Sequence, residues 1–244
     1  MSDRFYRHVI TVAAPLALAV VSMATACGGA AATSADTQTP GRTVCGAGNT
    51  THKGDLRITH EGAAAVAAQC TRIEGDLVVE GGALTTVPPL AVTEVTGDVL
   101  VGPAFRLTSV SGLKGLTRVG GSLKIRSNLS LRGLFLNGLR RVEGDLVVDG
   151  NSELASVSLP RLADVSGNVT VARNRSLLRF ELIATERVGG RFSVEDNPLL
   201  DDVVTVSLRT IDGGVVVRGN KKLAPGVAAA LQAKARAAVP AANK

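Results

Sequence analysis

Hydrophobic and polar residues alternate in short stretches that recur about every 23 residues between residues 73 and 223. Positions +2 and +4 after a conspicuous glycine are apolar in every copy, as in Leu146 and Val148, whereas positions +1, +3 and +5 are mixed. Alternation with a period of two residues predicts half-buried β-strands. Equivalent strands one repeat apart pair in parallel and in register, so the pattern predicts a solenoid. The glycines at position 0 are Gly75, Gly97, Gly121, Gly144, Gly167, Gly190 and Gly213.

The remainder of each repeat supplies the other walls of a coil. Apolar residues recur at position +10, near +13, near +16 to +18 and at +21. Aromatic residues make up only 2% of the chain, so the core is expected to be aliphatic. A fully buried Leu or Val contributes about 1.5–3 kcal/mol. The expected fold is therefore mainly β: a single right-handed parallel β-helix with a short helix capping each end.

An asparagine follows each of the last five glycines at position +7, where the strand has just ended. A side-chain amide at that place can bond to backbone groups of its own coil and of the next. We expect an inward-pointing ladder; sugar or metal binding is the functional alternative. The glycine at position 0 is expected where a positive φ or a close approach between coils excludes a side chain. The ladder residues are Asn128, Asn151, Asn174, Asn197 and Asn220.

Both ends of the repeat array carry sequences typical of caps. The N-terminal cap is expected over residues 44–72, with an Ala-rich helix from Glu61 to Gln69 whose apolar face contains Ala64, Ala65 and Ala68. Residues 73–223 form the coils. A helix over residues 225–239 then closes the solenoid, which spans residues 44–238, before a tail at 240–244. Contact of this basic helix with a membrane is the alternative.

Residues 1–26 have the pattern of an export signal: positive charges, a short apolar stretch, and small residues directly before Cys27. The small residues and the cysteine resemble the lipobox of bacterial lipoproteins, which implies lipidation of Cys27; simple cleavage is the alternative. Residues 27–43 lack large apolar side chains and predict a flexible tether. The expected location is the bacterial cell envelope, at the outer membrane in a Gram-negative cell, with secretion as the alternative. Lipid is the only expected membrane contact.

The chain contains three cysteines. If Cys27 carries lipid, Cys45 and Cys70 remain as a pair in an oxidising compartment. Two buried free thiols are the alternative.

With these features placed, the chain resembles the receptor L domain, the leucine-rich-repeat-like β-helix of insulin and epidermal growth factor receptor ectodomains. The resemblance rests on Val44-Cys45, on the stretch from Cys70 to Val79, and on the repeated Val-x-Gly-x-Leu-x-Val…Asn-x-x-Leu phrase. It implies that the first cysteine pairs with the one before the Ile-x-Gly strand. It also implies a non-enzymatic recognition scaffold outside the cytoplasm. Receptor signalling does not carry over, because the chain shows no cysteine-rich module and no kinase domain.

The chain has few residues in arrangements typical of catalysis or metal binding. His52 and His60 lack a cysteine or carboxylate cluster at ligand spacing, and no Ser/His/Asp constellation occurs, so neither an enzyme nor a cofactor or metal is expected. The net charge is +6, but the aromatic platforms that stack bases are missing, so nucleic acid is not an expected partner. A catalytic β-helix acting on polysaccharide is the third alternative.

The outward position +3, with positions +1 and +5 around it, supplies the candidate binding face. Apolar residues rimmed by charge are typical of interaction patches, although β-propensity alone also explains exposed valines. The sequence therefore predicts a scaffold that binds a protein or glycan at the cell surface. A structural envelope lipoprotein without a discrete ligand is the alternative. The candidate residues are Val78, Leu100, Lys124, Arg126, Val147 and Asp149.

Overall fold

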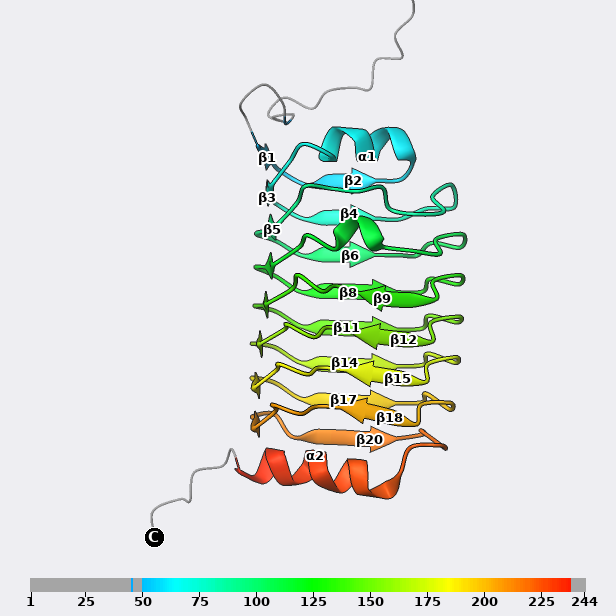
Figure 1. Ribbon diagram of the computed structural model, residues 1–244, viewed down its shortest axis with the longest axis vertical. Helices are drawn as coiled ribbons and strands as arrows, with labels where there is room; N and C mark the ends of the chain where they lie inside the picture. Colours follow the sequence, from blue (N-terminus) through cyan, green and yellow to red (C-terminus); the bar gives the residue numbers. More distant parts are fainter. Residues whose placement is uncertain (1–44, 46–49, 238–244) are drawn as a thin grey trace, which may run out of the picture. The chain divides into compact units, whose positions relative to one another are not determined.

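The computed structural model describes residue 45 and residues 50–237, and these form a stack of parallel β-coils (Figure 1). The expected export signal, Cys27, the tether at 27–43 and the tail at 240–244 lie outside the described residues. The mainly β solenoid, with coils about 23 residues apart, is confirmed.

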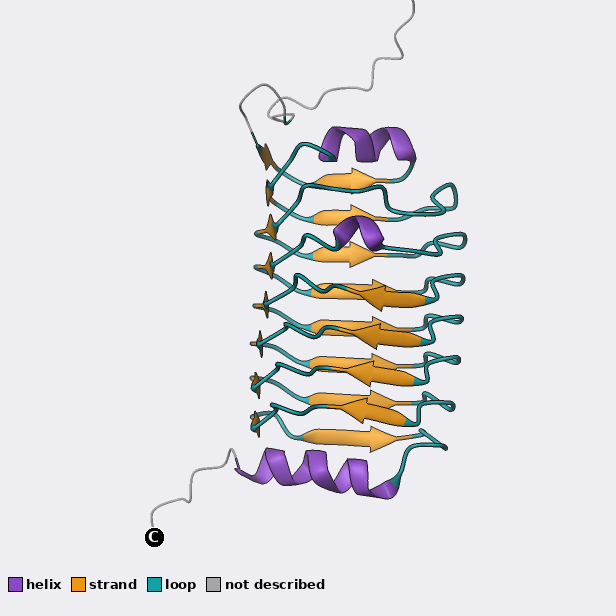
Figure 2. Ribbon diagram, viewed as in Figure 1, coloured by secondary structure: helices purple, strands orange, loops and turns teal. Residues whose placement is uncertain are grey.

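Each coil contributes one strand to each of two long parallel sheets, and four coils add a strand to a third sheet (Figure 2). The first sheet contains β1 (Thr51–Lys53), β3 (Arg72–Glu74), β5 (Glu94–Val95), β7 (Arg118–Val119), β10 (Arg141–Val142), β13 (Asp164–Val165), β16 (Arg187–Val188) and β19 (Thr210–Ile211). The second contains β2 (Leu56–Ile58), β4 (Leu77–Val79), β6 (Val99–Val101), β8 (Leu123–Arg126), β11 (Leu146–Asp149), β14 (Val169–Ala172), β17 (Phe192–Glu195) and β20 (Val215–Arg218). The third contains β9 (Gly133–Phe135), β12 (Ser156–Ser158), β15 (Arg179–Glu181) and β18 (Asp202–Val204).

The core is a set of aliphatic columns that run through the coils. Positions +2, +4, +10, +13 and +21 point inward and are buried in the central coils, as for Leu146, Val148 and Val165. The expectation of inward residues near +16 to +18 needs one correction. Positions +15 and +18 are buried, as in Leu136 and Leu139, whereas +16 is exposed in most coils, because the chain turns there toward the first sheet.

A helix covers each end of the stack (Figure 1). Helix α1 (Glu61–Ala67) lies over β2 and buries Ala64 and Ala67, while Ala65 and Ala68 are exposed. Its buried face therefore follows i, i+3 spacing and differs from the predicted one. Helix α2 (Pro225–Ala237) buries Leu231 at the other end, and Lys234 Nζ donates a 2.7 Å hydrogen bond to the carbonyl of Thr205. A short 3₁₀ helix, η1 (Ser111–Leu113), lies within one coil.

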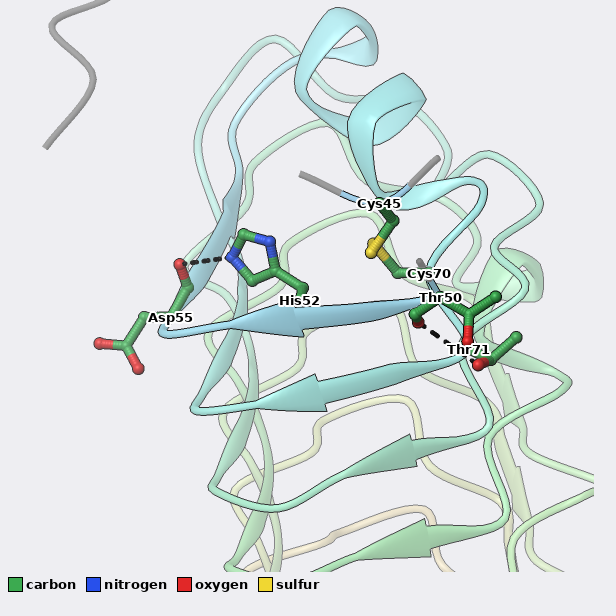
Figure 3. The surroundings of a disulfide bond; sticks show 6 residues. All are labelled: Cys45, Thr50, His52, Asp55, Cys70 and Thr71. Atoms are coloured by element: carbon green, nitrogen blue, oxygen red, sulfur yellow. Dashed lines mark hydrogen bonds between the residues drawn. A yellow bond between two sulfur atoms is a disulfide. The ribbon is translucent and has the colours of Figure 1, made fainter. Parts of the chain in front are cut away.

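A disulfide joins Cys45 to Cys70 and encloses a loop with a sequence separation of 25 (Figure 3). Both cysteines are buried beneath α1 together with His52, which occupies a core column that is Ile or Val in every later coil. The disulfide thereby fastens the N-terminal cap to the first coils.

The asparagines at position +7 are bonded to one another along the stack. In each step, the backbone N–H and the Nδ2 of one asparagine donate to Oδ1 of the next, at 3.1 and 3.0 Å from Asn151 to Asn174. The Nδ2 of Asn174 also donates to the carbonyl of Val148 at 2.9 Å, and Asn128 to Asn197 are fully buried. The ladder thus satisfies polar backbone groups at the turn between the second and third sheets.

We expect Asn174→Ala to lower the free energy of unfolding by roughly 1–3 kcal/mol, because the buried N–H of Asn151 loses its acceptor. Chemical denaturation measures this loss. Asn137→Ala, at an exposed asparagine outside the ladder, is the matched control and should be neutral. Equal stability of the two variants would contradict the ladder.

Candidate functional site: the outer face of the second sheet

The outward side chains of the second sheet form three columns, at positions +1, +3 and +5. The central +3 column runs in register from Arg57 across all eight strands to Val216. Consecutive members lie about 4.8 Å apart, as neighbouring strands do. This column with its two flanks is called the outer face below.

The predicted binding residues all lie on this outer face but differ in accessibility. Leu100 and Val147 are half-buried members of the central column, separated by Lys124. Val78 and Asp149 are each only 8% exposed, so they offer a partner little surface. Arg57, the register partner of Val78, forms an ion pair with Glu80 alongside that valine.

Lys124 is held by the neighbouring flank. Its Nζ lies 2.6 Å from Oδ2 of Asp98. Partial burial raises the pKa of the Asp98 carboxyl, but hydrogen bonds from Lys124 and from the N–H of Ser122 outweigh that effect, so the pKa lies below its ordinary value. The Asp98 carboxyl is therefore ionised at neutral pH, and its ion pair with Lys124 separates the apolar Leu100 from Val147.

Asp149 lies between two arginines on the +5 side. Its Oδ2 is 2.6 Å from Nη2 of Arg173 and 3.5 Å from Nη2 of Arg126, whereas its buried Oδ1 has no partner among the described residues. Arg173 stands in the left-handed backbone region with φ 54°. The cluster binds three neighbouring coils together at this edge of the outer face.

The +1 column forms a second ladder that sequence reasoning missed. The side-chain oxygen of each member accepts the backbone N–H of the next: Asn168 N donates to Asp145 Oδ1 at 2.7 Å, and Arg191 N donates to Asn168 Oδ1 at 2.8 Å. The sequence does contain a pattern that could have indicated this ladder, because Asp, Ser or Asn follows the glycine in nearly every coil. We expected these side chains to rim the binding face; instead one oxygen of each supports the fold. The ladder comprises Asp55, Asp76, Asp98, Ser122, Asp145, Asn168 and the N–H of Arg191.

The outer face is hollowed near its C-terminal end. A shallow cavity of about 470 Å³ lies between the +1 and +3 columns, within the size range of small-ligand sites. Its polar lining comes from Asp145, Asn168, Thr170, Arg191 and Ser193, and two position-0 glycines leave it open. None of these residues was among the predicted binding residues, although Thr170 and Ser193 lie in the same +3 column as Leu100 and Val147.

The other two faces differ in character. The outward side of the first sheet is a row of alternating ion pairs, such as Arg118 Nη2 to Glu143 Oε1 at 2.6 Å and Arg187 Nη2 to Asp212 Oδ2 at 2.5 Å. The third face and its corners carry scattered exposed apolar residues, including Phe105, Phe135 and Val206. These singletons form no continuous column comparable to the outer face.

Within the described ranges, no group of three or more His, Cys, Asp or Glu side chains could hold a metal ion. His52 is buried in the N-terminal cap, and His60 is exposed beside α1. No helix among residues 50–237 has the length and apolar character needed to cross a bilayer.

Comparison with known proteins yields no match to a family model, to a curated protein or to a solved structure. The resemblance to the receptor L domain therefore stays a hypothesis that rests on the cysteine and repeat phrases.

Proposed function

We propose that the protein is a non-enzymatic recognition scaffold of the cell envelope, which binds a protein or glycan partner through the outer face. The observation behind this proposal is that different columns of side chains have different structural roles. Two ladders and the aliphatic core hold the coils together, whereas Leu100 and Val147 in the +3 column belong to none of these. These half-buried residues lie on either side of Lys124 and are rimmed by charge, a composition typical of interaction patches.

Attachment at Cys27 forms part of the same proposal. The disulfide between Cys45 and Cys70 agrees with an oxidising compartment outside the cytoplasm. Lipid on Cys27, followed by a tether of residues 27–43, would hold the solenoid near a membrane surface while leaving the outer face free.

The test is a paired substitution on the outer face. Leu100→Asp combined with Val147→Asp should leave the melting temperature close to that of the wild type, because both side chains are only half-buried. Cross-linking on intact cells followed by pull-down should recover a partner with the wild type and lose it with this variant.

Ile183→Asp combined with Val206→Asp is the matched control, because it adds the same charge at exposed residues away from the outer face. The control should retain the partner. Loss of the partner in the control alone would place the binding surface elsewhere, and failure of the wild type to capture anything would favour a structural envelope protein.

A further inference from the structure

The second ladder ends abruptly at Arg191. Every earlier member of the +1 column offers a side-chain oxygen to the N–H of the next coil, but an arginine has only donors. Arg191 is exposed, lines the cavity and forms no ion pair within the described part of the chain. A guanidinium therefore stands where the preceding coils place a hydrogen-bond acceptor.

The loss of an acceptor at position 191 affects the next coil, at Gly214. Gly214 follows Gly213, which lines the cavity, and occupies the +1 position of its coil. By the pattern of the ladder, its N–H would donate to an acceptor at position 191, but Arg191 supplies none. No acceptor for this N–H occurs among the described residues, whereas the carbonyl of Gly214 accepts from Phe192 N at 2.9 Å. The end of the ladder thus leaves a backbone donor beside the unpaired guanidinium.

Two hydroxyl groups extend this donor-rich region into the cavity. Thr170 and Ser193 are register partners on β14 and β17, and both line the cavity. Ser193 is only 6% exposed, and no hydrogen-bond partner for its hydroxyl occurs among the described residues. Because this oxygen is not fully enclosed by protein, the hydroxyl is available to a ligand in the cavity.

The other end of the cavity carries a hydrogen-bond acceptor instead of donors. Asp145 lies two coils from Arg191, which places the two side chains about 10 Å apart along the sheet. Its Oδ1 is occupied by the N–H and Nδ2 of Asn168, so Oδ2 is left to accept hydrogen bonds from a ligand. The cavity therefore presents donors at one end and a carboxylate at the other.

We propose that this cavity binds an acidic sugar residue, with the sugar carboxylate against Arg191 and the N–H of Gly214, and sugar hydroxyls against Asp145. Arginine pairs with carboxylates through two parallel hydrogen bonds, and an aspartate accepts readily from hydroxyl groups. A neutral sugar would leave Arg191 without its counter-charge, and a small carboxylate without hydroxyl groups would leave Asp145 without hydrogen-bond donors. The assignment rests on the proposed recognition function and specifies its ligand class.

The test is an NMR titration of the ¹⁵N-labelled full chain with trigalacturonate, a trisaccharide of acidic sugars. The amide resonances of Gly214 and Ser193 should shift saturably. Arg191→Gln should weaken the affinity by at least about tenfold, since it removes a charged hydrogen-bond donor. Arg140→Gln, which removes the same charge at another exposed arginine outside the cavity, should bind like the wild type. Ser193→Ala should also weaken binding, by a smaller factor.

Three results would overturn the assignment. One is the absence of saturable shifts with trigalacturonate, and another is an equal loss of affinity in the Arg191 and Arg140 variants. The third is that maltotriose, a neutral trisaccharide, or acetate alone binds as tightly as trigalacturonate. Partner capture through Leu100 and Val147 is measured separately. Failure of the sugar titration would therefore reject the ligand class without rejecting the broader recognition proposal.

Discussion

Gly167→Ala is expected to lower the free energy of unfolding by about 3 kcal/mol, because the coils approach too closely at position 0 to admit a methyl group. A Cβ at residue 167 would lie 2.4 Å from Oδ1 of Asp145 and 2.7 Å from the backbone carbonyl of Gly144. The clash involves backbone and a ladder oxygen, neither of which can move without separating the coils. Of the two reasons anticipated for this glycine, close approach therefore applies here.

Urea denaturation of Gly167→Ala and Gly82→Ala measures the effect. A methyl group on Gly82 would have no atom within 4 Å, and the φ of this residue is not left-handed, so its substitution should change stability by less than about 0.5 kcal/mol. A Gly167→Ala protein as stable as the Gly82→Ala protein would show that the coils are further apart than the structure has them.

Replacement of both Cys45 and Cys70 by alanine is expected to cost about 3–4 kcal/mol, because the open loop regains the conformational entropy that a sequence separation of 25 otherwise restricts. The loss should be concentrated in the N-terminal cap. Amide hydrogen exchange should therefore accelerate in β1 to β4 more than in β14 to β17.

Cys27→Ala is the control for that variant, since residue 27 precedes the solenoid. It should unfold like the wild type. Reducing agent should bring the wild type to the stability of the double variant, and a double variant with unchanged stability would contradict the role assigned to the disulfide.

The sequence predicts the inward columns well, since a 23-residue repeat has one arrangement that buries positions +2, +4 and +10 together. Val148, Leu154 and Asn151 were placed inward from spacing alone, and all three are buried. The corner near +16 was less predictable, because Ile183 and Val206 are apolar yet exposed. Hydrophobicity at a turn does not reveal which side of the chain faces the core.

The outer face was predictable only in part. Asp145 and Asn168 have the polar character expected of a rim, and their role as acceptors depends on the distance between coils, which a sequence does not contain. Position +6 gives a similar example: it is left-handed at Ser127, Arg173 and Asp196 as well as at Gly150, and no single residue type marks it. The importance of Arg191 likewise appears only once Gly214 is seen beside it.

The irregular +3 column of the second sheet carries the proposed function, while the regular positions build the coil. Photo-cross-linking on intact cells, with a photoreactive side chain at position 147 or at position 183, tests it most directly. We expect a specific adduct from position 147 and none from position 183. An adduct from position 183 alone would contradict it.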